Sequence, residues 1–221
     1  MAPDPLKYSD SIYVMNALWR FFLVACLGGG VLTSLADNNQ VQGQTETAVL
    51  GGGCFWCLDA QFRLIPGVEK VISGYAGGET PNPTYEQVCT DQTGHAEVIQ
   101  VEFDPAKVSY EDLLRKFFMA HDPTSLNFQG PDIGKRYRSI ILYTSDTQRA
   151  SAEKIKAETQ SRWSHPIVTE IVLLKNFYAA EDYHQDYFSK NPNEVYCRSV
   201  VAPRVGEFQS LLEKEKAQPK N

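Results

Sequence analysis

The alternation of side chains in residues 95–103 limits the fold of this chain more than any other feature of its sequence. Glu97, Ile99, Val101 and Phe103 fall on one face of an extended segment, and the residues between them fall on the other. A period of two residues is the period of a β-strand. We therefore predict a strand here, and the elements around it decide what kind of sheet it joins.

Turn-forming residues divide the chain on both sides of this strand into further elements. Strand, helix, strand, strand, helix, strand is the order of a ferredoxin-like split βαβ unit, in which a largely antiparallel sheet carries helices on one face. We predict an α/β (α+β) fold class: a ferredoxin-like two-layer sandwich with extra helices and a long C-terminal coil. The predicted strands are 48–50, 68–75, 95–103, 139–143 and 167–174, and the predicted helices are 54–64, 109–121, 146–162 and 178–188.

Three parts are expected along the 221 residues, a length that can bury one sizeable core. Apolar residues are few between Asn191 and Val200, which predicts a coil that wraps the domain before a short helix from Arg204 to Lys216. The predicted parts are an N-terminal segment with a polar linker at 1–47, the main domain at 48–198 and a C-terminal tail at 199–221.

Residues 15–36 resemble an export signal or a membrane anchor. Residues 21–35 are apolar and uncharged, Lys7 and Arg20 precede them, and a polar run follows at 37–47. A triple glycine inside the segment and a length below about 18 residues disfavour a stable spanning helix. The protein is therefore predicted to be exported or membrane-anchored through residues 15–36, with a cytoplasmic location as the alternative.

Charge and residue content exclude several classes of protein. A net charge of -6 provides no basic field for a nucleic acid or an anionic lipid surface. Four histidines dispersed along the chain do not suggest a set of metal ligands. Five cysteines are too few for a disulfide scaffold, and the CxxC spacing of Cys54 and Cys57 favours a redox or catalytic use. The remaining cysteines are Cys26, Cys89 and Cys197.

Cys54 directly follows a triple glycine, at the predicted first turn of a helix. The positive end of the helix dipole and free backbone N–H groups favour a thiolate at such a position. Phe55 and Trp56 add an apolar wall beside the sulfur. The alternative is a buried structural cysteine, for which two large aromatic neighbours are ordinary core residues.

Glu97 shares its strand face with three apolar residues, where a charged carboxylate is costly to desolvate. Burial raises the pKa of such a carboxyl group, and a carboxylic acid that stays neutral near pH 7 can donate a proton. The sequence therefore makes Glu97 a candidate general acid. The alternative is that this end of the strand is exposed and Glu97 is simply solvated.

Several motifs follow one another along residues 48–197, and together they resemble those of the A-type peptide-methionine sulfoxide reductases. Several multi-residue motifs in one order are more specific than any one of them, so the resemblance implies repair of oxidised methionine. The motifs are Gly52-Gly53-Cys54-Phe55-Trp56, Gly74-Tyr75-Ala76-Gly77-Gly78, Pro81-Asn82-Pro83-Thr84-Tyr85, Gly94-His95-Ala96-Glu97, His121-Asp122-Pro123, Gln129-Gly130, Asp132, Tyr137-Arg138-Ser139, Ala180-Glu181-Asp182-Tyr183-His184-Gln185 and Lys190-Asn191-Pro192.

The resemblance also implies roles for individual side chains. The Cys54 thiolate would attack the sulfoxide sulfur while Glu97 protonates the oxygen, which leaves a thioether and a sulfenic acid on Cys54. A methyl pocket combined with donors for the oxygen would select one epimer, which in this family is the S form. The implied substrate contacts are Tyr85 and Tyr137 to the oxygen, Phe55 and Trp56 to the ε-methyl group and Asp132 to the substrate backbone.

A sulfenic acid on Cys54 needs a second thiol to return to the thiol state. Cys57 lies one helical turn away, where many members of the family carry glycine, and Cys197 lies in the C-terminal segment where many members carry their resolving cysteine. We predict Cys57 as the first resolving residue, with Cys197 or a relay through both as alternatives. Cys89 lies in a loop outside either pattern.

The family implies a dithiol partner such as thioredoxin as the reductant, so no bound cofactor is expected, and we expect a monomer. Two other functions fit part of the sequence. A thioredoxin-type dithiol oxidoreductase also places CxxC at a helix start, but it has no use for Glu97. A non-catalytic domain that only recognises oxidised methionine has no need of Cys54.

Overall fold

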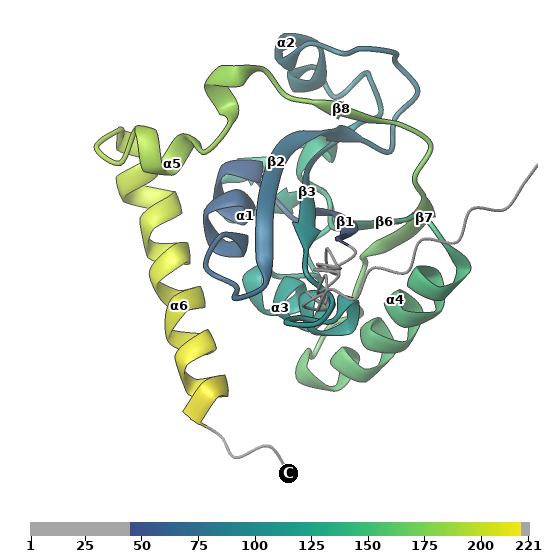
Figure 1. Cartoon of the computed structure of the whole chain (residues 1–221). Coiled ribbons are helices and arrows are strands. Elements are labelled where there is room, and N and C mark those ends of the chain that lie inside the picture. The colour runs from purple at the N-terminus through teal and green to yellow at the C-terminus, as the bar shows by residue number, and fades with distance from the viewer. Residues whose placement is uncertain (1–44, 218–221) are drawn as a thin grey trace, which may run out of the picture. The chain divides into compact units, whose positions relative to one another are not determined.

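The computed structural model describes residues 45–217, which are coloured by residue number in Figure 1. Within this range no helix is both long and apolar enough to cross a membrane. The predicted signal or anchor at residues 15–36, with Cys26 inside it, lies outside the described residues.

Six strands form one sheet, and β1, β2 and β3 lie side by side at its centre (Figure 1). The order across the sheet is β7-β6-β1-β3-β2-β8, in which only β6 and β7 are parallel neighbours. The prediction of a strand at 95–103 is confirmed, with its first residue one position later. The strands are β1 (Glu46–Gly51), β2 (Val68–Ala76), β3 (Ala96–Phe103), β6 (Ile140–Tyr143), β7 (Glu170–Leu173) and β8 (Phe177–Ala179).

The two faces of the sheet carry different apolar clusters because successive strand residues point to opposite sides. Leu50 and Ile99 belong to the larger cluster, which they share with the helices, whereas Val49 and Val98 belong to a smaller cluster on the other face. Helix α1 packs on β2 and β3, and α4 packs on β6 and β7. The four longer helices are α1 (Phe55–Phe62), α3 (Tyr110–Ala120), α4 (Asp146–Thr159) and α6 (Ala202–Ala217).

Helix α3 shows how the sequence determines a helix start and a packing face. The Ser109 hydroxyl accepts a hydrogen bond from the Asp112 backbone N–H, so one of the unpaired donors of the first turn is satisfied. Leu113, Leu114 and Phe117 are completely buried in the large core. The helix predicted at 109–121 is confirmed, and it is one residue shorter at each end.

Short elements occur where only loops were predicted. Helix α2 (Tyr85–Cys89) starts with a capping box between Thr84 and Gln87. The loop predicted at 122–137 contains a two-stranded hairpin of β4 (Phe128–Gln129) and β5 (Asp132–Ile133), followed by the 3₁₀ turn η1 (Lys135–Tyr137). These elements matter because three of them, α2, β5 and η1, carry residues of the site described below.

The predicted helix at 178–188 is wrong. Phe177–Ala179 forms β8, which pairs with the edge of β2, and only the 3₁₀ turn η3 (Asp182–His184) and the single-turn helix α5 (Tyr187–Lys190) follow. The close approach of β8 requires glycine at position 74, since a Cβ there would lie 2.5 Å from the Tyr178 carbonyl oxygen. Pairing with a distant strand outweighs the local pattern here.

The predicted helix from Arg204 to Lys216 is confirmed, but the coil predicted before it is wrong from Cys197 onward. A π-helical segment, η4 (Cys197–Val201), continues directly into the 16-residue helix α6. Val201, Val205, Phe208 and Leu212 recur at the spacing of one helix face, and all four contribute to the large core or pack against it. Burial of this face on α1 and α3 explains why the segment is helical.

Candidate active site

The start of α1 holds Cys54 next to a carboxyl group from β3. Cys54 is the N-cap residue of the helix, and only 6% of its surface is exposed. The Phe55 backbone N–H donates to Oε2 of Glu97 across 3.1 Å. Glycine at position 51 permits this arrangement, because a Cβ there would lie 2.7 Å from the Glu97 carbonyl oxygen. Strand and helix are thereby held together at the cysteine.

Glu97 is buried rather than solvated, with 1% of its surface exposed. Burial raises the pKa of its carboxyl group to about 8, although the hydrogen bond from Phe55 and the charge of Arg136 both act to lower it. Most of the Glu97 carboxyl groups are therefore protonated at pH 7. The arrangement provides a proton donor beside the Cys54 sulfur.

Seven of the residues predicted from the sequence meet at one pocket of about 240 Å³. They come from α1, α2, β3, β5 and η1, which are separate along the chain. The lining combines aromatic rings, a cysteine, two acids and three phenols. The lining residues are Cys54, Phe55, Trp56, Tyr85, Glu97, Asp132, Tyr137 and Tyr196.

The Trp56 ring is fixed from two sides. It stacks on Tyr187 with ring centroids 3.7 Å apart and an interplanar angle of 6°. Its indole Nε1–H donates to Nδ1 of His184 across 3.2 Å, which assigns the remaining proton of the neutral imidazole to Nε2. The His184 ring also packs against Phe55. The pocket therefore has a rigid aromatic wall.

Asp132 enters the pocket from the β4–β5 hairpin and is held by residues near the C-terminus. The Tyr196 hydroxyl donates to Oδ2 of Asp132 across 2.8 Å, and Nη1 of Arg204 lies 3.9 Å from the same oxygen. The C-terminal segment thus completes one side of the site.

The two cysteines of the CxxC pair differ in acidity. Burial raises the pKa of the Cys54 thiol well above its usual value, and the neighbouring Cys57 and Glu97 act in the same direction. The pKa of Cys57 is lowered by a hydrogen bond from Cys54 and by Arg204. Burial of Cys54 thus opposes the thiolate that a helix terminus was expected to favour.

The remaining cysteines lie away from the pocket lining. Cys57 is 2% exposed and sits one turn into α1, and Cys197 is completely buried at the start of η4. Cys89 is half-buried at the end of α2. Among residues 45–217, no three His, Cys, Asp or Glu side chains gather in a way that could hold a metal ion.

Sequence reasoning missed Tyr196, Arg204 and His184 as parts of the site. Tyr196 directly precedes Cys197, so its position was visible but no function was assigned to it. Arg204 was assigned to a tail outside the main domain. Its place in the site depends on α6 packing back onto α1, which no local pattern indicates.

Comparisons with known proteins agree on one family. The family profile described as "Peptide methionine sulfoxide reductase" matches residues 46–217. Peptide methionine sulfoxide reductase MsrA of Haloquadratum walsbyi is 54% identical over 161 residues, which are 73% of this chain and 92% of that protein. The reduced form of Mxr1 from Saccharomyces cerevisiae is 40% identical with a TM-score of 0.66, over 69% of this chain and 89% of that one. Methionine sulfoxide reductase A of Corynebacterium diphtheriae is 38% identical with a TM-score of 0.65, over 70% and 78% of the two chains.

Proposed function

Because this chain belongs to the peptide methionine sulfoxide reductase family and is an oxidoreductase, we propose that it reduces methionine-S-sulfoxide, free or in proteins, at Cys54. The observation that carries the proposal is the 3.1 Å hydrogen bond that holds the protonated Glu97 carboxyl at the start of α1, beside the cysteine. A buried acid next to a thiol can protonate the sulfoxide oxygen, a step that simple disulfide exchange does not contain. The biological purpose would be repair of oxidative damage.

The reaction transfers one oxygen atom from the substrate to Cys54. The Cys54 sulfur attacks the sulfoxide sulfur, and Glu97 gives its proton to the sulfoxide oxygen and takes the proton of the Cys54 thiol. The S–O bond of the substrate breaks and a thioether is released, while the cysteine becomes a sulfenic acid. The substrate sulfur gains two electrons and the cysteine sulfur loses two.

The other lining residues would bind the substrate. The phenols of Tyr85 and Tyr137 can donate hydrogen bonds to the sulfoxide oxygen, and burial keeps their pKa values well above 10, so both stay protonated. Phe55 and Trp56 form the apolar wall for the ε-methyl group, and Asp132 would accept from the substrate backbone. Separate contacts for the methyl group and for the oxygen would select one epimer, which we propose to be the S form.

Cys57 is the better placed of the two candidate resolving cysteines. It lies three residues after Cys54, in the first turn of α1, and a CxxC pair within one helical turn can close with a small rearrangement. Cys197 is completely buried within η4, on a different element from Cys54. A thioredoxin-like dithiol partner then reduces the disulfide, and a relay through Cys197 is the alternative route.

Several further features of the protein belong to the same proposal. The inner strands follow the order β6-β1-β3-β2 with antiparallel pairing, which supports a ferredoxin-like assignment for the core of the sheet. A main domain at 48–198, a monomeric state and export or anchoring through residues 15–36 remain predictions.

Separate peptides with S and R methionine sulfoxide test the proposed function directly. The intact protein is expected to convert the S peptide to the thioether with dithiothreitol as reductant and to leave the R peptide unchanged. Methionine formed is measured by chromatography. If both peptides remain oxidised, sulfoxide reduction is excluded, and dithiol exchange must be tested instead with a disulfide substrate.

The resolving cysteine can be identified by comparing the two reductants. Cys57→Ser is expected to keep turnover with dithiothreitol, which can reduce the sulfenic acid directly, and to lose at least about tenfold with thioredoxin. Cys197→Ser is expected to retain thioredoxin turnover, and Cys89→Ser is the control. Loss of thioredoxin turnover in Cys197→Ser alone would instead assign the resolving role to Cys197.

The hydrogen bond from Trp56 to His184 predicts a binding effect. His184→Phe keeps an aromatic ring but removes the acceptor of the Trp56 N–H, which should lower kcat/KM by about fivefold, the equivalent of about 1 kcal/mol for one hydrogen bond. Steady-state kinetics with the S peptide measures this change. The control is His165→Phe, because His165 is exposed on the segment that follows α4. An unchanged kcat/KM in His184→Phe would mean that the stacking on Tyr187 alone fixes the indole.

A further inference from the structure

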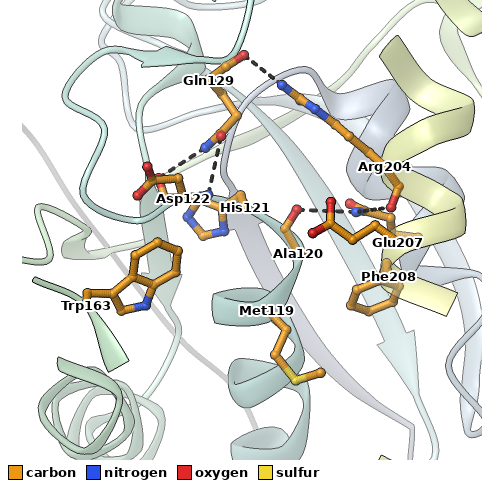
Figure 2. A pocket seen from close by; sticks show the side chains of 10 residues that line it. Met119, Ala120, His121, Asp122, Gln129, Trp163, Arg204, Glu207 and Phe208 are labelled. Atoms are coloured by element: carbon orange, nitrogen blue, oxygen red, sulfur yellow. Dashed lines mark hydrogen bonds between the residues drawn. The ribbon is translucent and has the colours of Figure 1, made fainter. Parts of the chain in front are cut away.

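Arg204 lies in the first turn of α6, and its side chain extends between Cys57 on α1 and Gln129 on β4. Figure 2 shows its side chain extending to the Gln129 backbone oxygen, which Nη2 contacts at 2.9 Å, beside a cavity of about 270 Å³. The other guanidinium nitrogen, Nη1, lies 3.7 Å from Sγ of Cys57. The side chain is 21% exposed, so its charge acts on the sulfur through a largely buried environment.

Gly130 provides the room for this guanidinium. It has a φ of 59°, and a Cβ at that position would collide with Nη2 of Arg204. The absence of a side chain at Gly130 therefore lets the planar cation approach the cysteine pair from the side of the β4–β5 hairpin.

We propose that Arg204 is a positioning residue for Cys57, whose sulfur it holds as the thiolate that attacks the oxidised Cys54. This inference rests on the proposed function for its role in turnover, and it adds a residue from the C-terminal helix to the site. An arginine side chain is always charged in proteins, so a positive charge faces the Cys57 sulfur throughout. A purely structural arginine would tie α6 to the hairpin through Gln129 and would not face the sulfur.

The resolving step balances with this assignment. The Cys57 thiolate attacks the sulfur of the Cys54 sulfenic acid, the S–S bond forms and the S–O bond breaks. The leaving hydroxide takes the proton of Glu97 and departs as water. In this step the Cys57 sulfur is oxidised by one electron and the Cys54 sulfur is reduced by one. The thiol reductant later supplies two electrons and the protons that restore both thiols.

Several titratable groups surround the Cys57 sulfur, and each contributes to the pH dependence of its reactions. Arg204 is the cation that faces it, and the remaining groups are thiols, acids and a phenol from four other parts of the fold. These groups are Cys54 at the start of α1, Glu97 on β3, Asp132 on β5, and Tyr196 and Cys197 at the start of η4.

Alkylation of Cys57 tests the proposal without any turnover. In a full-length Cys54→Ser background, which leaves a hydroxyl beside Cys57, the rate of reaction with iodoacetamide is followed from pH 5 to 10 by peptide mapping. Arg204→Gln should move the midpoint of this profile up by about one pH unit and slow alkylation at pH 7 about tenfold, because the thiolate is the reactive form. Arg204→Lys should restore at least half of the shift.

The control is Arg198→Gln, since Arg198 is exposed on η4 and lies on the same C-terminal segment. Its profile should match that of the parent protein. A parent-like midpoint in both Arg204→Gln and Arg204→Leu, with circular dichroism unchanged, would overturn the proposal.

A second measurement follows the disulfide itself in protein with all cysteines present. After one equivalent of the S peptide is added, Arg204→Gln should form the Cys54–Cys57 disulfide about tenfold more slowly at pH 7 than the Arg198→Gln control. A failure of the intact protein to reduce the sulfoxide would reject the proposed function while leaving the alkylation result valid, so the two failures are distinguishable.

Discussion

Replacement of Cys54 by serine is expected to abolish sulfoxide reduction with every reductant, by roughly 10⁴-fold or more relative to the intact protein. A serine hydroxyl is a far weaker nucleophile than a thiol toward sulfur, and it cannot carry the oxygen as a sulfenic acid. The measurement is methionine formed from the S peptide with dithiothreitol, and the first turnover must be lost as well as the steady state.

Cys89→Ser provides the matched control, because Cys89 lies on α2 outside the pocket lining. The Cys54→Ser variant should still bind the substrate, since the residues of the aromatic wall are unchanged. Retained turnover in Cys54→Ser would assign the nucleophile to another thiol, and Cys57, with its lowered pKa, would be the first to examine.

The pair of Cys54 and Glu97 was predictable from the sequence because each depends on a local pattern. Strand alternation assigned the carboxyl group to an apolar face, and the glycine turn assigned the cysteine to a helix start. The sequence did not predict their relative acidities. The pKa of Cys54 is raised because the site is enclosed on several sides at once, and burial of this kind depends on tertiary packing.

The errors in the fold have the same origin. The Phe177–Ala179 strand forms because the edge of β2 is available to it. The helix predicted at 204–216 extends back through η4, where a coil was predicted, because its apolar face can pack on α1 and α3. Both elements therefore depend on packing partners that are distant in the sequence. By contrast, the start of α3 at Ser109 and its buried face follow from neighbours three and four residues apart, and a helix was predicted there at 109–121.

Arg204 illustrates why part of the site could not be predicted. An arginine in a segment with many charged residues has no local property that separates it from a solvated side chain. Its contact with Sγ of Cys57 exists only because η4 and α6 pack against α1. The same packing places the Tyr196 hydroxyl against Asp132. The C-terminal segment thus contributes to the site through residues whose roles are visible only in three dimensions.

Glu97→Gln is expected to slow the reduction of the sulfoxide by about 10²–10⁴-fold, because the amide cannot donate a proton in the manner of a carboxylic acid. The substitution keeps the shape of the side chain and an oxygen that can accept from the Phe55 N–H. Single-turnover formation of methionine, without any reductant, isolates this step from recycling. A loss below threefold would mean that Tyr85 or Tyr137 supplies the proton.

The pH profile gives an independent test of the same residue. The acid form of Glu97 is required and the pKa of its carboxyl is about 8, so the single-turnover rate of the intact protein should be level below that pH and fall about tenfold per unit above it. Glu97→Gln has no such group, and its residual rate should show no decline above pH 8. A decline that persists in the variant would belong to another titrating group.

The raised pKa of Glu97 also sets the sign of a stability effect. Between pH 4.5 and about 8 the folded protein holds a proton at Glu97 that the unfolded chain releases. The contribution of this group to the free energy of unfolding is therefore complete below pH 4.5 and is lost as the pH rises through about 8, by an amount on the order of a few kcal/mol. Urea unfolding at pH 5 and pH 8 should show Glu97→Gln gaining stability relative to the intact protein as the pH rises. Glu97→Gln would then be slow because it lacks the carboxylic acid and not because it unfolds. The intact protein would retain Glu97 as its proton donor at the cost of a lower free energy of unfolding at alkaline pH.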